Sequence, residues 1–229
     1  MLILLSILFS SLSAEILIPM DLTQTNHLKA YGIAFQSVKD GYQVKWLLNY
    51  RGGSFLLKDL QYLKSECNIR GVSFEMVTGS DIAMINEEIN ANNMESVTLE
   101  KEPKIAVYTP PNSTPWDDAV TMALVYADID YDQIWDEEVL NGALEDYDWL
   151  HLHHEDFTGQ YGKFYGTYRN AQWYKDEVSA NENMARRLGY NKVWQMKHYV
   201  ANKIREFVIN GGFLFAMCAA TDTIDIALS

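Results

Sequence analysis

The chain has 229 residues, of which 48% are hydrophobic and 21% charged, so it can bury a sizeable core. Eighteen Lys and Arg against 31 Asp and Glu give a net charge of −13, which repels nucleic acid phosphates and anionic membrane surfaces. We therefore expect a globular protein that does not bind nucleic acid.

The first 14 residues have the pattern of a secretory signal peptide. An apolar stretch is followed by small residues at Ser11, Ser13 and Ala14, where cleavage is expected. The stretch is shorter than the roughly 20 residues that a membrane-spanning helix needs. Lys and Arg, which usually precede such a stretch, are missing, so a buried first strand is the alternative. We predict a signal peptide over residues 1–14, export to the periplasm or the extracellular space, and no membrane span.

From residue 15 onward, short apolar runs alternate with helical patterns, which is typical of a parallel sheet covered by helices on both faces. The expected strands are 15–20, 42–50, 72–77, 104–109, 131–135, 147–153 and 211–217. The expected helices include one with Leu28, Tyr31, Phe35 and Val38, one with Phe55, Leu56, Leu60 and Leu63, one starting at Thr114 to Asp118, and one with Val193, Met196, Val200, Ile204 and Phe207. We predict one doubly wound, mostly parallel α/β domain over residues 15–229.

The last helix begins near Cys218 and reaches Ser229 without the Gly or Asn that usually ends a helix. We therefore expect the domain to be incomplete at its C-terminus, as a piece of a longer protein.

Polar residues follow the predicted strands. In an open parallel sheet the carboxyl ends of the strands share one edge, where ligands bind. Candidate substrate-binding residues at this edge are Asp21, Asn26, His27, Arg51, Gly52, Gly53, Trp116 and Asp156.

Cys218 stands between the last strand and the last helix. There a thiol projects from a tight turn and faces the positive end of a helix, which favours the thiolate. Ala216, Ala219 and Ala220 allow close backbone approach, and the Ala219 N–H is a candidate oxyanion donor. The alternative is a small core cysteine. Cys67, expected at the opposite edge, lies too far away for a disulfide with Cys218.

The segment "DWLHLHHED" places His153, His154 and Glu155 at the same edge. One of the two histidines can act as a base for the thiol, with Glu155 orienting it. Two alternatives remain: these residues line a pocket without taking part in chemistry, or they bind zinc. His151 is expected to pack within its strand.

The stretch "FLFAMCAATD" resembles the nucleophile elbow of the class I glutamine amidotransferase-like superfamily, with Ala216 and Ala220 in place of the glycines of GxCxG. More specifically, "LLNYRGGSF", "PWDDAVT", "LHLHHEDFTGQYGKF" and "FAMCAATDTIDIAL" resemble exported bacterial proteins commonly labelled asparagine synthetase B. The resemblance covers nearly the whole chain and implies a flavodoxin-like fold and cysteine amide chemistry.

The resemblance does not extend to asparagine synthesis. Leu2 follows Met1, where that enzyme has its nucleophilic cysteine, and no SGGxDS loop for ATP occurs. The superfamily's catalytic histidine usually lies well downstream of the cysteine, so here the base is either outside this sequence or supplied from elsewhere.

These patterns together predict an exported cysteine-dependent amide hydrolase or acyl-transfer enzyme. It would need no cofactor and would act on a small polar amide or amino-acid-like substrate. A non-catalytic ligand-binding domain of the same fold and a metal-dependent hydrolase using the histidines of residues 151–156 remain the alternatives, and the oligomeric state stays open.

Overall fold

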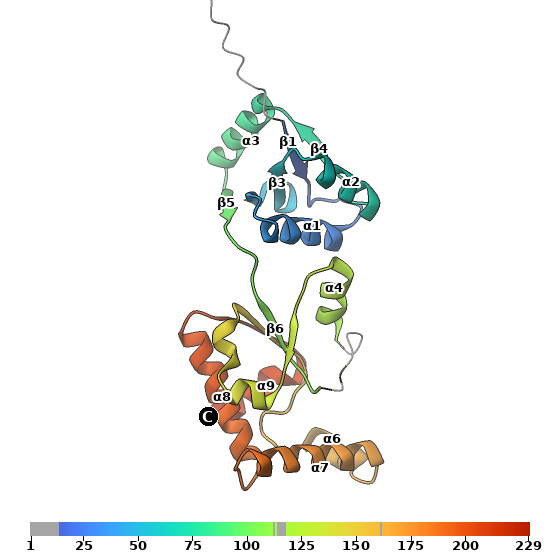
Figure 1. Ribbon diagram of the computed structural model, residues 1–229. Helices are drawn as coiled ribbons and strands as arrows, with labels where there is room; N and C mark the ends of the chain where they lie inside the picture. The colour runs from blue at the N-terminus through green and yellow to red at the C-terminus, as the bar shows by residue number, and fades with distance from the viewer. Residues whose placement is uncertain (1–13, 112, 114–117, 161) are drawn as a thin grey trace, which may run out of the picture. The chain divides into compact units, whose positions relative to one another are not determined.

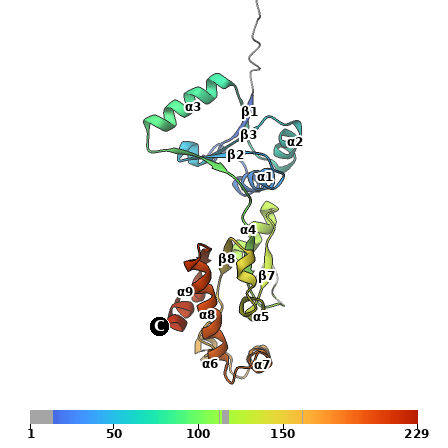
Figure 2. The ribbon, with the colours of Figure 1, turned by 60° about the vertical axis from the view of Figure 1, so that its left-hand side comes forward.

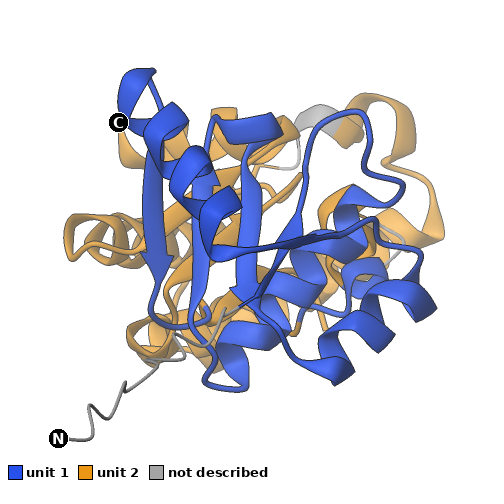
Figure 3. Cartoon of the chain, turned by 90° about the horizontal axis from the view of Figure 1, so that it is seen from above, with its two compact units in different colours: residues 1–102, 125–129 blue, residues 103–124, 130–229 orange. Residues whose placement is uncertain are grey.

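The computed structural model describes residues 14–111, 113, 118–160 and 162–229, which form two compact units (Figure 3). Unit 1 comprises the described residues up to Glu102 together with Val125–Ile129. Unit 2 comprises Pro103–Leu124 and Asp130–Ser229. Each unit has its own sheet and its own hydrophobic core.

Unit 1 is built on an antiparallel sheet, sheet A, with the strand order β4-β1-β3-β2-β5. Its strands are β1 (Glu15–Ile18), β2 (Val44–Leu48), β3 (Ser54–Lys58), β4 (Glu75–Val77) and β5 (Glu95–Leu99). Its helices are α1 (His27–Lys39), α2 (Gln61–Arg70) and α3 (Gly79–Ala91), with a short 3-10 turn at Tyr50–Gly52 (Figure 1).

The expectation that residues 15–77 contribute to a parallel sheet is wrong. The strands β2 and β3 form a hairpin, with Leu47 opposite Ser54, and β3 then pairs antiparallel with β1. Left-handed backbone at Asn49 and Arg51, and at the two glycines that follow, closes this turn. The Arg-Gly-Gly segment is therefore a hairpin turn and not the entry to a helix.

Strand β3 shows why the helix expected at Phe55 to Leu63 is wrong. Phe55 and Leu57 pack into one buried cluster, while Leu56 between them packs into another on the opposite face. A strand buried on both faces reads as a continuous apolar run, which periodicity alone does not distinguish from a helix. The helix of this region, α2, begins only at Gln61.

Unit 2 contains sheet B, a parallel sheet with the strand order β7-β6-β8-β9. Its strands are β6 (Ile105–Tyr108), β7 (Asp132–Ile134), β8 (Trp149–Leu152) and β9 (Phe213–Ala216). Its helices are α5 (Asp136–Leu140), α6 (Gly162–Tyr168), α7 (Gln172–Arg187), α8 (Val193–Ile209) and α9 (Cys218–Leu228), and a 3-10 turn covers Ala143–Asp146. Helix α4 (Ala119–Ala127) begins in unit 2, and its residues from Val125 onward belong to unit 1. The α/β class and the parallel pairing of these four strands are confirmed.

The hydrophobic core of unit 2 lies between one face of sheet B and helix α8. Leu150 and Leu152 of β8 and Leu214 of β9 pack with Val200 and Ile204 of α8. Helix α9 lies beside α8, as both ribbon views show (Figures 1 and 2). The apolar stripe predicted for residues 193–207 is thus confirmed as the buried face of a helix.

The strand order places a topological switch within sheet B. From β6 the chain moves to β7 on one side, and then β8 and β9 follow on the other side of β6. Loops leaving the carboxyl ends of β6 and β8 therefore diverge, and such a point is where open α/β sheets bind ligands. Within the described part of the chain, none of the helices is both long and apolar enough to cross a membrane.

Candidate functional site

Cys218 has the backbone of a strained turn. It starts α9, one residue after the end of β9, and its φ of 49° lies in the left-handed region that residues with a Cβ seldom adopt. Its side chain is exposed, and its thiol is free, as is that of the buried Cys67. The two cysteines are not bridged, but Cys67 belongs to unit 1 and does not lie at the opposite edge of the sheet that carries Cys218, as the sequence predicted.

The register of β8 and β9 brings Cys218 alongside the histidine segment. Leu152 pairs with Ala216, and the Met217 N–H donates to the Leu152 carbonyl at 2.9 Å. The Ala220 N–H then donates to the His153 carbonyl at 3.2 Å. Cys218 is thus flanked by two backbone bonds to the end of β8, and the expectation that it shares an edge with His153 is confirmed.

Ala219 follows Cys218 in the first turn of α9. Backbone N–H groups in a first helical turn have no partner within their helix. The Ala220 N–H is occupied by the carbonyls of His153 and Met217, whereas the Ala219 N–H is the next amide after the thiol. The Ala219 N–H is therefore the amide best placed in sequence to donate a hydrogen bond to an anion beside the thiol.

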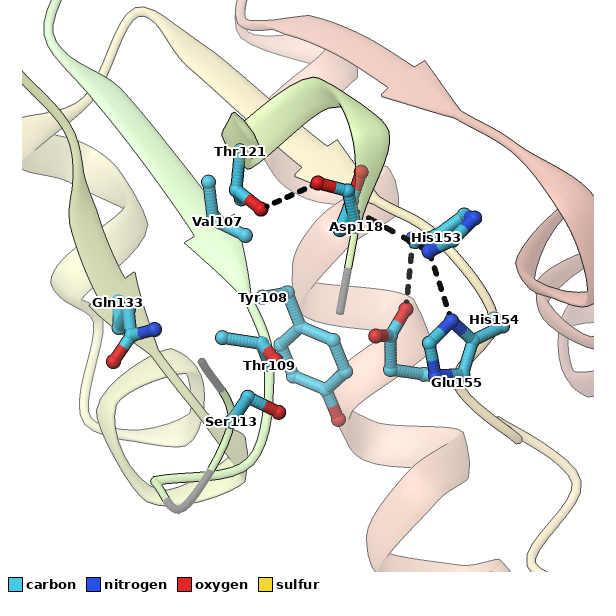
Figure 4. Close-up of a pocket in the computed structure, with 10 residues that line it drawn as sticks. All are labelled: Val107, Tyr108, Thr109, Ser113, Asp118, Thr121, Gln133, His153, His154 and Glu155. Atoms are coloured by element: carbon cyan, nitrogen blue, oxygen red, sulfur yellow. Dashed lines mark hydrogen bonds and ion pairs between the residues drawn. The ribbon is translucent and has the colours of Figure 1, made fainter. Parts of the chain in front are cut away.

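A small pocket lies where β6 and β8 end, next to the topological switch (Figure 4). Asp118, His153, His154 and Glu155 lie on one side of it, and Gln133 lies on the other. The remaining lining residues are Val107, Tyr108, Thr109, Ser113 and Thr121. Most of these residues have polar side chains, although the surface they expose to the pocket is mostly apolar, and all of them belong to unit 2.

Asp118 connects two imidazoles. Its Oδ2 lies 2.6 Å from Nε2 of the fully buried His151 and 3.6 Å from Nδ1 of His153. Its Oδ1 accepts the Val120 N–H at 2.6 Å, as a residue preceding a helix does. Burial raises the pKa of Asp118, but the hydrogen bonds from Val120 and His151 and the nearby imidazoles outweigh it, so the net shift is downward.

The sequence predicts that Glu155 orients an imidazole, but its hydrogen bonds go to other groups. Its Oε2 accepts the backbone N–H of His153 at 2.8 Å, and its carbonyl accepts the Thr223 hydroxyl of α9 at 2.7 Å. Asp156 caps a turn by accepting the Thr158 N–H at 2.8 Å. These two residues hold the backbone after β8 against α9, while His153 and His154 contact each other through their Nδ1 atoms at 2.8 Å.

A buried charge network supports the pocket wall at Tyr108. The Tyr108 hydroxyl donates to Asp136, and Lys197 Nζ donates to the Tyr108 oxygen at 2.8 Å and to Asp136 at 2.9 Å. Lys197 also lies 4.1 Å from the ring centroid of Trp135. Burial, together with the charge and hydrogen bond of Asp136, raises the pKa of Tyr108 well above its usual value.

The candidates from the first half of the chain lie in unit 1, and the structure does not place them on the sheet edge that carries Cys218. The physical reason is the antiparallel hairpin, which makes sheet A separate from sheet B. Arg51 Nε donates to Asp21 at 2.8 Å, and its Nη1 donates to Glu75 at 2.9 Å. Both Asp21 and Arg51 are thus occupied by ion pairs.

Local structure accounts for the other unit 1 candidates. The Asn26 side chain caps α1 by accepting the Lys29 N–H at 3.1 Å, and His27 Nε2 lies 3.2 Å from the carbonyls of Met20 and Asp21. A Cβ on Gly52 would lie 2.4 Å from the Met20 oxygen, so only glycine fits there. The Gly53 carbonyl accepts the Trp46 indole N–H at 3.0 Å. Trp116 lies outside the described residues.

Sequence reasoning missed Asp118 and His151 as site residues. In the sequence, Asp118 stands out only as part of an expected helix start, and His151 only as a residue expected to pack within its strand. Their positions in the sequence could have pointed to them. Asp118 follows the loop after β6, and His151 lies on β8, the strand that neighbours β6. Over the described residues, no group of three or more His, Cys, Asp or Glu is arranged to hold a metal ion, so the histidine segment lacks a zinc ligand set there.

Comparisons with known proteins found no matching family model, no similar curated protein and no similar solved structure.

Proposed function

We propose that this chain is a cysteine-dependent amide hydrolase or acyl-transfer enzyme of the class I glutamine amidotransferase-like superfamily. The proposal rests chiefly on Cys218, an exposed thiol with a φ of 49° at a strand-to-helix turn. A strained turn of this kind presents a nucleophile above a sheet edge and directs it toward a helix N-terminus.

The proposed reaction uses the residues around this turn. The Cys218 sulfur attacks the amide carbonyl, and its proton passes to the imidazole of His153 or His154. The Ala219 N–H donates to the oxyanion that forms. Collapse of the tetrahedral intermediate breaks the C–N bond, and the imidazolium returns the proton to the leaving amine. Water or an acceptor amine then cleaves the thioester, restoring the thiol.

The arrangement of unit 2 supports this proposal in part. Renumbered from β6, the order of sheet B is 2-1-3-4, which agrees with the first strands of a flavodoxin-like sheet. Side chains that can hydrogen-bond a polar amide, among them His153, Glu155 and Gln133, line the pocket beside the switch. Export remains a separate proposal that depends on the pattern of residues 1–14.

The test compares the wild-type chain with Cys218→Ser and with the matched variant Cys67→Ser. A panel of small primary amides is assayed for ammonia release, and the rate of alkylation by iodoacetamide is measured for each protein. We expect turnover and rapid alkylation in wild type and Cys67→Ser, and neither in Cys218→Ser. A Cys218 that reacts no faster than a free peptide thiol, with turnover unchanged in Cys218→Ser, would refute the proposal.

A second candidate is a ligand-binding domain without catalysis. One observation favours it: the pocket is lined by His153, His154 and Glu155, and Cys218 is not among its lining residues. Under this proposal the same amides bind without turnover, and Cys218→Ala leaves their affinity unchanged by calorimetry. Loss of binding in Cys218→Ala would exclude it.

A further inference from the structure

Asp118 lies between two imidazoles, that of His153, which lines the pocket, and that of the fully buried His151. The contacts run from His151 Nε2 to Asp118 Oδ2 at 2.6 Å, from that oxygen to His153 Nδ1 at 3.6 Å, and from His153 Nδ1 to His154 Nδ1 at 2.8 Å. Asp118 is itself only 9% exposed. These contacts bear on which ring nitrogens of His151 and His153 carry a hydrogen.

Both ring nitrogens of His151 face acceptors. Nδ1 lies 3.2 Å from the Phe215 carbonyl of β9, and Nε2 lies 2.6 Å from the Asp118 carboxylate. Neither a carbonyl nor a carboxylate can donate, so both contacts are hydrogen bonds when each nitrogen carries a hydrogen. The ring of His151 also stacks on Phe215 at a centroid distance of 5.6 Å.

The position of His153 follows from this pair. Its Nδ1 faces the Asp118 carboxylate on one side and His154 Nδ1 on the other. A hydrogen on His153 Nδ1 is attracted by the carboxylate and can be donated to His154, whereas a lone pair there would face a negative charge. With its hydrogen on Nδ1, His153 would carry its lone pair on Nε2, the nitrogen that can accept a proton.

Two further ionisable groups that the structure describes near this ring, Glu155 and Tyr131, do not compete for it. Glu155 binds the backbone N–H of His153 and not its imidazole. Tyr131, before β7, has a raised pKa because it is buried and because the Asp118 charge disfavours the phenolate, so it stays neutral. The lowered pKa of Asp118 is consistent with a carboxylate that stays charged between the two rings.

We propose that Asp118 and His151 are positioning residues that hold a hydrogen on His153 Nδ1 and leave Nε2 as the base for the Cys218 thiol. This inference rests on the proposed function and narrows its choice of base to His153. His151 acts through Asp118, and its bond to the Phe215 carbonyl fixes the pair to strand β9, which leads into the Cys218 turn.

Imidazole nitrogen NMR of the full chain labelled with ¹⁵N-histidine tests the inference near neutral pH. In wild type we expect two N–H signals for His151 and an Nδ1–H tautomer for His153. In Asp118→Asn we expect His151 to lose one hydrogen and His153 to shift toward Nε2–H. Asp132→Asn, a carboxylate of β7 outside the pocket, is the matched control and should leave both spectra unchanged. A singly protonated His151 in wild type, or an unchanged His153 tautomer in a folded Asp118→Asn, overturns the inference.

The pH profile of Cys218 alkylation tests the positioning role of Asp118 separately from the proposed cysteine-dependent activity. We expect Asp118→Asn to slow alkylation near pH 7 about tenfold and to bring the profile close to that of a free thiol, with far-ultraviolet circular dichroism confirming the fold. An Asp118→Asn profile that matches wild type overturns the positioning role. A wild-type Cys218 that already reacts like a free peptide thiol overturns the proposed function instead, whatever the histidine spectra show.

Discussion

The backbone N–H of Ala220 donates a hydrogen bond of 3.2 Å to the carbonyl of His153. This bond joins the first turn of α9 to the segment that leaves β8, and the pairing of Leu152 with Ala216 fixes the chain on the other side of Cys218. With both sides fixed, the surrounding structure imposes the positive φ of Cys218.

Replacing Cys218 by glycine should reveal this strain. Glycine adopts a positive φ freely, whereas alanine carries the same penalty as cysteine. We expect Cys218→Gly to be more stable than Cys218→Ala by about 1 kcal/mol, measured by urea unfolding. Ala219→Gly, one residue later in ordinary helix, should instead lose stability relative to wild type. Equal stability of the two Cys218 variants would contradict the strained turn.

The two cysteines should differ sharply in reactivity. Burial raises the pKa of Cys67 to about 11, so its thiolate is scarce near neutral pH, and its side chain lies inside the core of unit 1. Cys218 is exposed. Brief treatment of the native protein with iodoacetamide should modify Cys218 alone, as peptide mass spectrometry would show, while both react in denaturant. Native labelling of Cys67 at a comparable rate would contradict the packing of α2.

Removing the charge of Lys197 should destabilise unit 2. Lys197→Met leaves Asp136 buried and without its cation, which typically costs about 3–5 kcal/mol. The matched variant Lys203→Met removes a lysine of the same helix that lies at the surface, and its melting temperature should hardly change. The double variant Asp136→Leu with Lys197→Met should recover part of the loss, because no unpaired charge then remains. A wild-type melting temperature for Lys197→Met would show that the pair is not buried.

Acid should weaken the Asp21 to Arg51 pair of unit 1. The hydrogen bonds from Arg51 and Thr23 lower the pKa of Asp21 to about 2 from its usual 3.8. Because the folded value is below the unfolded one, the stabilisation is complete above about pH 4 and is lost as the pH falls through about 2. Urea midpoints of wild type and Asp21→Asn should therefore differ at about pH 5 and converge toward about pH 2. Glu87→Gln, on the exposed face of α3, is the control, and a constant difference between wild type and Asp21→Asn over this range would contradict the prediction.

The sequence predicted unit 2 well because its elements carry distinct signals. The stripe from Val193 to Phe207 fits only a helix, and the apolar runs that became β6 and β8 are short and separated by clear helical segments. Short strands separated by helices indicate a parallel sheet, since parallel neighbours need crossovers. The shared edge of Cys218 and His153 follows from that topology.

The antiparallel pairing of unit 1 could not be recognised from the same reasoning. Phe55, Leu56 and Leu57 are buried on alternating faces of β3, so neither a period of two nor one of 3.6 stands out. The turn that decides the topology depends on left-handed backbone at Asn49 and Arg51, residue types that do not demand it. Likewise, only the fold brings Asp118, which precedes α4, to His151 of strand β8, 33 residues further along the chain.

Strands β8 and β9 pair in parallel although α6, α7 and α8 all intervene between Leu152 and Phe213. Closing so long a connection is entropically costly, and contacts between residues far apart in sequence form slowly. We therefore expect the bend at Cys218 to be among the last features to form as the chain folds. Until that step is complete, the thiol behaves as an ordinary cysteine, so any special reactivity would report that folding has finished.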